Sequence, residues 1–279
     1  TDSTDFPVRS PYQGRFAGGT CDAFVSVLKA KPPLVLEKGD YNGDGTSDIA
    51  VFRPSSGLWA VRDLTRVYFG NSFSIPVPGD YGGDGTAVLG VFDENSGRWA
   101  LRDLTRVHLG SAADLPVPGD YNGDGRCEMG IYRASSGLWA IRGVSRACFG
   151  SGAEIAVPGY YDGTGRKGMG IYRPSSGLWA LQGLTRIYFG RLADWPVPGD
   201  YDGDGRWEAG VFRPSAGLWA LRGVTAVCFG GGADQPAPAD YNGNGADDIA
   251  IFRDSTGLWT LQDLTGVYFG APGDFAATR

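Results

Sequence analysis

The chain repeats itself with a fixed period of 40 residues. A segment reading PVPGDYGGDG at 76–85 returns as PVPGDYNGDG at 116–125, AVPGYYDGTG at 156–165, PVPGDYDGDG at 196–205 and APADYNGNG at 237–245, and a first copy, EKGDYNGDG, lies at 37–45. The third residue before each Gly-x-Gly falls at 40, 80, 120, 160, 200 and 240, so no copy carries an insertion. Six units of equal length must therefore adopt one supersecondary structure and meet equivalent neighbours.

Each unit has the pattern of a short β-sheet. In the second copy, turn residues separate four apolar runs, which predict strands over 75–79, 89–92, 99–102 and 106–109. The 46 glycines and 17 prolines among 279 residues exclude a helical bundle or coiled coil. Pro76 and Pro78 lack the N–H that an interior strand needs, so the first strand is predicted to be an edge strand lining a central channel. Four strands per 40 residues predict an all-β propeller with six four-stranded blades.

The loop after the first strand carries the strongest chemical pattern. In the first copy it reads Asp40-Tyr-Asn42-Gly-Asp44-Gly-Thr46-Ser-Asp48, which places oxygen side chains at positions 1, 3, 5 and 9 around a sharp glycine turn. Calcium takes six to eight oxygen ligands, and the carbonyl of position 7 can add one more. The pattern therefore predicts a calcium-binding loop in each copy that keeps these oxygens.

The stretch DYNGDGxxDIAVFRPSSGLW resembles the FG-GAP or VCBS repeat of integrin α-subunit propellers and of many secreted bacterial proteins. The resemblance covers residues 37–279. It implies a β-propeller whose calcium loops join the first two strands of a blade.

Four of the six loops keep all the oxygen side chains. We predict about four structural calcium sites, with the position-7 residue of each loop coordinating through its carbonyl. The predicted ligands are Asp40, Asn42, Asp44, Thr46 and Asp48; Asp120, Asn122, Asp124, Arg126 and Glu128; Asp200, Asp202, Asp204, Arg206 and Glu208; and Asp240, Asn242, Asn244, Ala246 and Asp248. The second copy has Gly82 and Val88 at positions 3 and 9, and the fourth has Tyr160, Thr164 and Gly168, so these two are predicted to bind weakly or not at all.

The net charge, the hydropathy and the cysteine positions bear on the partners and the location of the protein. The net charge of −6 disfavours nucleic acid or an anionic membrane surface as partner and permits cations. No apolar run reaches 18 residues, which argues against a membrane span. Calcium modules that bind in the range of roughly 10⁻⁴–10⁻³ M suit an extracellular protein, and we expect a secreted one. Cys148 and Cys228 lie two repeats apart and are not expected to bond to each other, while the partners of Cys21 and Cys127 are left open.

Two periodic side chains have two interpretations each. Six tryptophans recur at 59, 99, 139, 179, 219 and 259, and they either pack between blades or stack on sugars, with packing favoured. Arginines recur at 53, 133, 173, 213 and 253, and they either bind an anion or pair with loop carboxylates such as Asp63, Asp103 or Asp263, with pairing favoured. The off-period Trp195 and Trp207 are expected to be exposed.

No catalytic group stands out. His108 is the only histidine, and its strand-four position holds Tyr or Cys in other copies, which indicates packing. A Ser-His-Asp triad would have to use His108, and a zinc site would need more nitrogen or sulfur ligands than the sequence offers. We expect no enzyme, and a carboxylate pair of the glycosidase type rests only on the abundance of acids.

Residues 1–36 carry no repeat and are treated as a separate segment from the propeller at 37–279. The segment either closes the propeller or forms an arm that docks on a protein partner or a second copy. Three functions remain: a secreted, calcium-stabilised interaction or structural module of the appendage or adhesion type, which we prefer; a multivalent lectin with glycan sites between blades; and a carbohydrate-active enzyme.

Overall fold

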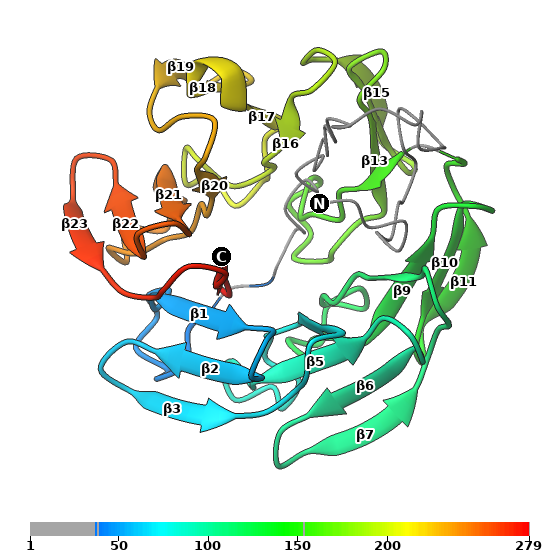
Figure 1. Cartoon of the computed structure of the whole chain (residues 1–279). Coiled ribbons are helices and arrows are strands. Elements are labelled where there is room, and N and C mark those ends of the chain that lie inside the picture. Colours follow the sequence, from blue (N-terminus) through cyan, green and yellow to red (C-terminus); the bar gives the residue numbers. More distant parts are fainter. Residues whose placement is uncertain (1–36, 38, 153, 279) are drawn as a thin grey trace, which may run out of the picture. The chain divides into compact units, whose positions relative to one another are not determined.

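The computed structural model describes residues 37, 39–152 and 154–278. These residues belong to the second of two units into which the chain divides, Pro33–Arg279. They form six antiparallel sheets of four strands arranged in a ring. Within each sheet the strands lie one beside the next, from the innermost strand near the centre of the ring to the outermost (Figure 1). The predicted six-bladed all-β propeller is confirmed. The expectations for residues 1–36, Cys21 included, lie outside the described residues.

The strands follow the 40-residue period. Blade one contains β1 (Ala50–Arg53), β2 (Leu58–Val61), β3 (Thr65–Tyr68) and β24 (Phe275–Ala276). Blade two contains β4 (Ser74–Pro76), β5 (Gly90–Asp93), β6 (Arg98–Leu101) and β7 (Thr105–His108), and blade three contains β8 (Leu115–Pro116), β9 (Gly130–Arg133), β10 (Leu138–Ile141) and β11 (Ser145–Cys148). Blade four contains β12 (Ile155–Ala156), β13 (Gly170–Arg173), β14 (Leu178–Leu181) and β15 (Thr185–Tyr188).

The last two blades keep the same order. Blade five contains β16 (Trp195–Pro196), β17 (Gly210–Arg213), β18 (Leu218–Leu221) and β19 (Thr225–Cys228), with a 3₁₀ turn, η1 (Pro214–Ala216), between β17 and β18. Blade six contains β20 (Gln235–Pro236), β21 (Ala250–Arg253), β22 (Leu258–Leu261) and β23 (Thr265–Tyr268). The innermost strand of each blade pairs only with the second, and in blades two, three, five and six it ends in a proline, which has no N–H to donate to a further strand.

The C-terminal strand closes the ring. Strand β24 supplies the innermost strand of blade one, where Phe275 pairs with Phe52 and Ala276 with Val51. The first and last parts of the described chain therefore share one sheet, and no blade is left with an unpaired second strand. Repeats of equal length make this possible, because every blade fills an equivalent sector of the ring.

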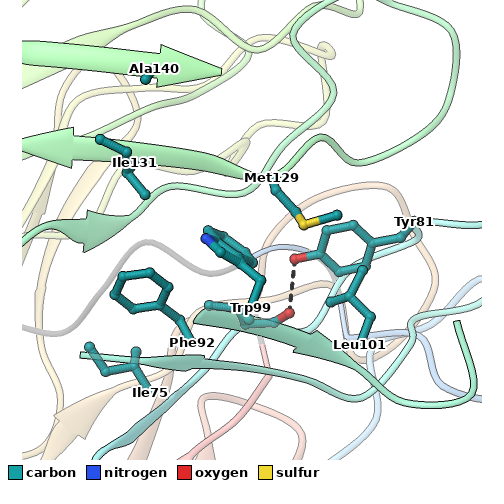
Figure 2. Close-up of a cluster of buried hydrophobic side chains, with 9 residues drawn as sticks. Ile75, Tyr81, Phe92, Trp99, Leu101, Met129, Ile131 and Ala140 are labelled. Carbon is teal, nitrogen blue, oxygen red and sulfur yellow. Dashed lines mark hydrogen bonds between the residues drawn. The ribbon is translucent and has the colours of Figure 1, made fainter. Parts of the chain in front are cut away.

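The six periodic tryptophans form the core between blades. Each is fully buried, lies 4.9–5.4 Å from the ring of a Phe or Tyr on the neighbouring strand, and donates its indole N–H to a backbone carbonyl ten residues further along at 2.9–3.1 Å. Figure 2 shows one such cluster, in which Phe92 and Trp99 of blade two meet Ile131 and Ala140 of blade three. The packing interpretation is confirmed, and these indoles have no surface to offer a sugar.

The periodic arginines hold the inner strand to the second strand. Arg53 forms a two-pronged pair with Asp274, with Nε–Oδ1 at 2.6 Å and Nη2–Oδ2 at 2.9 Å, and the Asp274 side chain is fully buried. Four other blades repeat the pair with the buried acids Asp114, Glu154, Asp194 and Asp234. Pairing was predicted and is confirmed, but these five arginines pair with buried acids; of the loop carboxylates named above, Asp63 and Asp103 lie 3.4 Å from the neighbouring Arg62 and Arg102. Blade two departs on both sides, with Asp93 in place of the arginine and Ser74 in place of the acid.

The outer strands differ from expectation. Tyr68, Tyr188 and Tyr268 are about three-quarters exposed, and His108, Cys148 and Cys228 at the equivalent position are exposed too. The prediction that this position packs in the core is therefore wrong, because the last residue of the fourth strand points to solvent. Cys148 and Cys228 carry free thiols, in agreement with the expectation that they do not bond. Among the described residues, no helix has the length and apolar character needed to cross a membrane.

The contribution of the Arg53–Asp274 pair to stability can be tested with the residues that blade two has at the same positions. Asp274→Ser leaves the Arg53 guanidinium without its carboxylate, and we expect a loss of about 2 kcal/mol in the free energy of unfolding, since hydrogen bonds to charged groups contribute about that much. Adding Arg53→Asp recreates the Asp93–Ser74 combination of blade two and should recover part of the loss. Urea unfolding of both variants measures this, and equal stability of Asp274→Ser and the unmodified protein would contradict the role of the pair.

Candidate metal centre

Six equivalent loops lead into the second strands of the blades, and in blades two to six each loop joins the inner strand to the second strand. We number them one to six with their blades: residues 40–48, 80–88, 120–128, 160–168, 200–208 and 240–248. Because the strands are antiparallel, all six loops open on the same face of the ring. The carbonyl at position 1 of each loop accepts a hydrogen bond of 2.6–3.1 Å from the backbone N–H at position 8 of the next loop, and the sixth loop is joined to the first through Ser47 and Asp240. A closed circuit of six backbone hydrogen bonds therefore fixes the loops relative to one another.

Within a loop, backbone N–H groups turn the side-chain oxygens inward. In loop one the carboxylate of Asp40 accepts hydrogen bonds from the N–H groups of Gly43 and Gly45 at 2.7 and 2.8 Å. The side chain at position 3 accepts from position 5, and that at position 5 accepts from position 7, each at 2.8 Å. Gly43 and Gly45 have φ of +78° and +91°, a left-handed conformation that explains why both positions are glycine.

Position 9 closes each complete loop. Asp48, Glu128, Glu208 and Asp248 all accept a hydrogen bond from the N–H of position 2 at 2.8–2.9 Å. In loops one, three and six, the amide of the asparagine at position 3 also donates to this carboxylate. The structure thus brings together the side chains at positions 1, 3, 5 and 9 that the sequence pattern selected, and their oxygen chemistry fits a hard cation such as calcium.

Loop five concentrates the most negative charge. Carboxylate oxygens of Asp200, Asp202, Asp204 and Glu208 all lie within 4.8 Å of one another, and three carboxylates of loop three, those of Asp120, Asp124 and Glu128, meet the same limit. Burial, followed by repulsion from Asp202, Asp200 and Asp204, raises the pKa of Glu208 to about 7 despite its hydrogen bond from Tyr201. Burial is also the main cause that raises the pKa of Asp48, Glu128 and Asp248. A divalent cation would relieve this repulsion.

Arginines lie across the two incomplete loops. The Arg126 side chain of loop three packs on Gly83 of loop two, and the Arg206 side chain of loop five packs on Gly163 of loop four. The exposed arginine side chain at position 7 therefore lies over the preceding loop. A guanidinium beside loops two and four disfavours a cation there, which agrees with the missing oxygens at their positions 3 and 9 or 1 and 9. Loop three, which keeps all four side-chain oxygens, receives Arg166 in the same way, so the missing oxygens and not the guanidinium distinguish loops two and four; loops one, five and six face Thr86, Ala246 and Thr46.

Position 8 differs in every loop, and sequence reasoning did not single it out. The residues are Ser47, Ala87, Cys127, Lys167, Trp207 and Asp247. Three of them, Cys127, Lys167 and Trp207, pack against the glycine that precedes the neighbouring loop. Irregularity at one position of an otherwise regular repeat was the available signal for this set.

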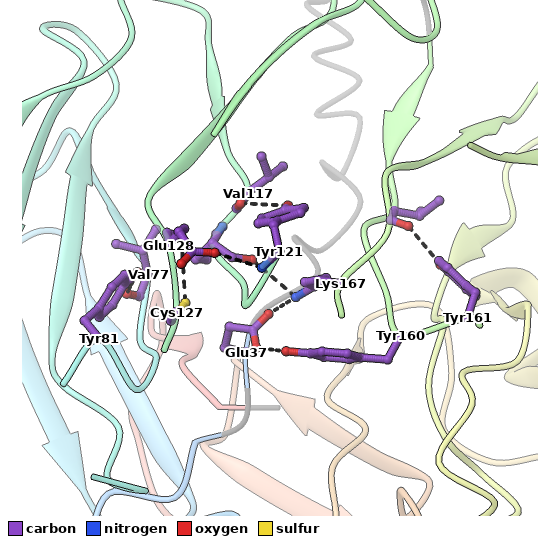
Figure 3. A network of polar contacts seen from close by, with 12 residues as sticks. Glu37, Val77, Tyr81, Val117, Tyr121, Cys127, Glu128, Tyr160, Tyr161 and Lys167 are labelled. Carbon is purple, nitrogen blue, oxygen red and sulfur yellow. Dashed lines mark hydrogen bonds and ion pairs between the residues drawn. The ribbon is translucent and has the colours of Figure 1, made fainter. Parts of the chain in front are cut away.

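Lys167 makes the most extensive contacts of this set. Its ammonium is fully buried, pairs with the carboxylate of Glu37 and lies 5.7 and 5.3 Å from the ring centres of Tyr160 and Trp207 (Figure 3). It also donates to the carbonyl of Pro118 at 3.3 Å. Loop four, which lacks the predicted ligands, thus holds the start of the described chain by an ion pair.

Two further expectations are corrected. Trp195 and Trp207 are half-buried and not exposed: Trp195 lies 6.2 Å from Phe212, and Trp207 lies 5.3 Å from Tyr160, measured between ring centres.

A groove between blades was expected for a lectin. One of about 630 Å³ is present between blades two and three, lined by His108 and Arg142 among others.

Comparisons with known proteins add little about function. No family model matches the chain, and no curated protein matches it. Among solved structures it is similar to a lectin of Agrocybe aegerita, described as recognising non-reducing terminal N-acetylglucosamine. That similarity has a TM-score of 0.49 at 14% identity and covers 76% of this chain and 72% of the lectin chain. A likeness of this extent says nothing about what this chain binds.

Loop five offers a test of the charge argument. Asp202→Asn copies the asparagine of loops one, three and six, and its amide can donate to Glu208 as Asn122 does to Glu128 at 2.6 Å. We expect the calcium-free protein to gain roughly 0.5–1 kcal/mol in unfolding free energy, the usual scale for partly exposed charges, and calcium to stabilise it less. Urea unfolding in calcium and in EDTA measures both changes. The control is Asp162→Asn in loop four, and an equal change in both variants would contradict the argument.

Proposed function

We propose that the chain is a calcium-stabilised propeller that serves as a secreted or cell-surface interaction module. The observation that carries the proposal is the repeated loop in which side-chain oxygens at positions 1, 3, 5 and 9 converge, above all the four carboxylates of loop five. About four ions would be held, by loops one, three, five and six. On the same grounds we propose membership of the FG-GAP/VCBS repeats, which the loop sequence resembles.

The proposed metal acts on stability. An ion bound only by the folded loop stabilises the fold by mass action, by about 2.7 kcal/mol at a concentration 100 times its dissociation constant. The loops are joined in a circuit of backbone hydrogen bonds and lead directly into the second strands, so ordering one loop supports the blades on both sides. We therefore assign calcium a structural role and not a catalytic one.

The proposed activity is binding rather than catalysis. Within the described residues one set of acids forms the loops and a second set is buried beneath arginines, while Asp63, Asp103 and Asp263 lie exposed one per blade at turns between outer strands. Each blade also carries an exposed aliphatic side chain at the turn between its third and fourth strands. These turns lie on the same face of the ring as the loops. These side chains are Leu64, Leu104, Val144, Leu184, Val224 and Leu264, and we propose them as part of the protein-binding face.

A glycan is the second candidate ligand. The observation that favours it is the groove between blades two and three, whose volume of about 630 Å³ falls within the usual range for small-molecule sites. The six periodic tryptophans are buried and cannot contact a sugar, so they give no reason to expect six equivalent glycan sites.

Removal of calcium should lower the melting temperature. Millimolar calcium is about one to ten times the expected dissociation constant, so each loaded loop adds about 0.4–1.4 kcal/mol, and EDTA is expected to reduce the melting temperature by roughly 1–5 °C for each site lost. Differential scanning calorimetry in calcium, magnesium and EDTA measures this. An identical melt in all three, with no calcium bound by equilibrium dialysis, would overturn the metal proposal.

The two ligand candidates separate in a binding assay. A glycan array probed in millimolar calcium should give no specific signal if the module binds protein alone, and a defined sugar signal would favour the glycan candidate. In parallel, light scattering of the full chain and of a chain lacking residues 1–36 tests self-assembly. Higher assemblies that disappear on this deletion support the interaction module, whereas a monomer in both cases contradicts assembly through this segment.

A further inference from the structure

The groove between blades two and three is lined on one side by an outer strand and on the other by the face of a sheet. Blade two contributes His108 from the end of β7, and blade three contributes side chains of β9, β10 and β11. Ile131, Ala140 and Arg146 lie side by side across the three strands of blade three, because Ala140 pairs with both of the others. Ile131 and Ala140 are buried beneath the groove, at 2% and 6% exposure, and Arg146 makes its outer edge cationic.

The groove holds cationic side chains and no acid. Arg142 and Arg146 are exposed, and neither guanidinium has a hydrogen bond or ion pair within the described part of the chain; the same holds for the imidazole of His108. Arg133 also lines the groove, but its guanidinium is already held by Asp114 at 2.7 Å. Two unpaired arginines in a protein of net charge −6 form a local site for an anion.

The combination occurs in one blade only. Arg62 and Arg102, which match Arg142 in blades one and two, lie 3.4 Å from the neighbouring Asp63 and Asp103, whereas residue 143 is glycine. Blades four and six have Gln182 and Gln262 at this position, and blade five keeps Arg222 but has Ala226 in place of Arg146. Only blade three therefore presents two arginines without a carboxylate beside them.

We infer that this groove binds an acidic saccharide, one that carries a carboxylate on a sugar ring, with one site per chain. The ligand class follows from the chemistry: carboxylates pair with Arg142 and Arg146, and the exposed imidazole of His108 can hydrogen-bond a sugar hydroxyl. The inference rests on the glycan candidate proposed above, and it specifies the ligand's charge and a stoichiometry of one instead of six.

The test compares three probes on the calcium-loaded chain by isothermal titration calorimetry: a glucuronate-containing tetrasaccharide, its carboxyl-reduced neutral counterpart, and an oligoglutamate of matched charge. The variant Arg142→Gln with Arg146→Ala uses residues already present at Gln182 and Ala226, so the fold should accept it. The matched control is Arg62→Gln with Arg66→Ala, the equivalent pair in blade one. An unchanged calcium-dependent melt shows that both variants are folded.

We expect the unmodified protein to bind the acidic tetrasaccharide at about one per chain, roughly tenfold or more tighter than the neutral one, as the loss of one charge-assisted contact implies. The blade-three variant should lose this preference and the blade-one variant should keep it. Equal binding of both saccharides, or an equal loss in both variants, overturns the inference while glycan binding itself stands. Stronger binding of oligoglutamate overturns the saccharide class, and absence of binding by either saccharide overturns both this inference and the glycan candidate.

Discussion

The pairing of the C-terminal strand β24 with β1 is the contact on which the ring depends. Only when Phe275 and Ala276 lie beside Phe52 and Val51 does blade one acquire its innermost strand. Every other blade has its four strands from one continuous stretch, so among the described residues blade one is the only sheet whose strands come from opposite parts of the chain. The buried Asp274 strengthens this place, because its carboxylate takes both a backbone N–H and the guanidinium of Arg53. The tryptophan cores between blades follow from closure, since each blade then has a neighbour on both sides.

The loops carry the effect of closure to the candidate metal sites. Each loop is bonded at position 1 to the next loop, and each of the four complete loops is also bonded at position 9 to its own position 2, so the oxygens are placed by the ring as much as by the glycines of the loop. This arrangement makes the repulsion among the carboxylates of loop five a property of the whole assembly: the loop cannot open to separate Asp202 from Glu208 without loosening its neighbours. A cation that neutralises the cluster would act on the ring rather than on one turn.

Periodicity explains why so much was predictable. Strand positions, the blade number, the tryptophan core and the convergence of positions 1, 3, 5 and 9 all repeat, and an error in one copy is corrected by five others. What failed or was missed depends on which way a side chain points: the exposed strand-four position of His108, the half-buried Trp207, and the buried acids that hold the arginines. Strand β24 was missed because Phe275 to Thr278 lacks the prolines that mark the innermost strand segment in the other copies, although β8, β12, β16 and β20 are equally short. The charge of the groove between blades two and three depends on Arg142, Gly143 and Arg146, a combination that no other copy repeats.

The first and last described parts of the propeller meet within the innermost strand of blade one. This strand is formed by Phe275 to Thr278, and Gly39 continues it, with the N–H of Asp48 bonded to the carbonyl of Gly39 as that of Val88 is bonded to that of Gly79. Thr278 lies so close to Gly39 that a side chain there would collide with it. A permuted chain in which residue 278 is followed directly by residue 39, and which is opened at any of the six turns between blades, would therefore encode the same six contacts between neighbouring blades in a different order.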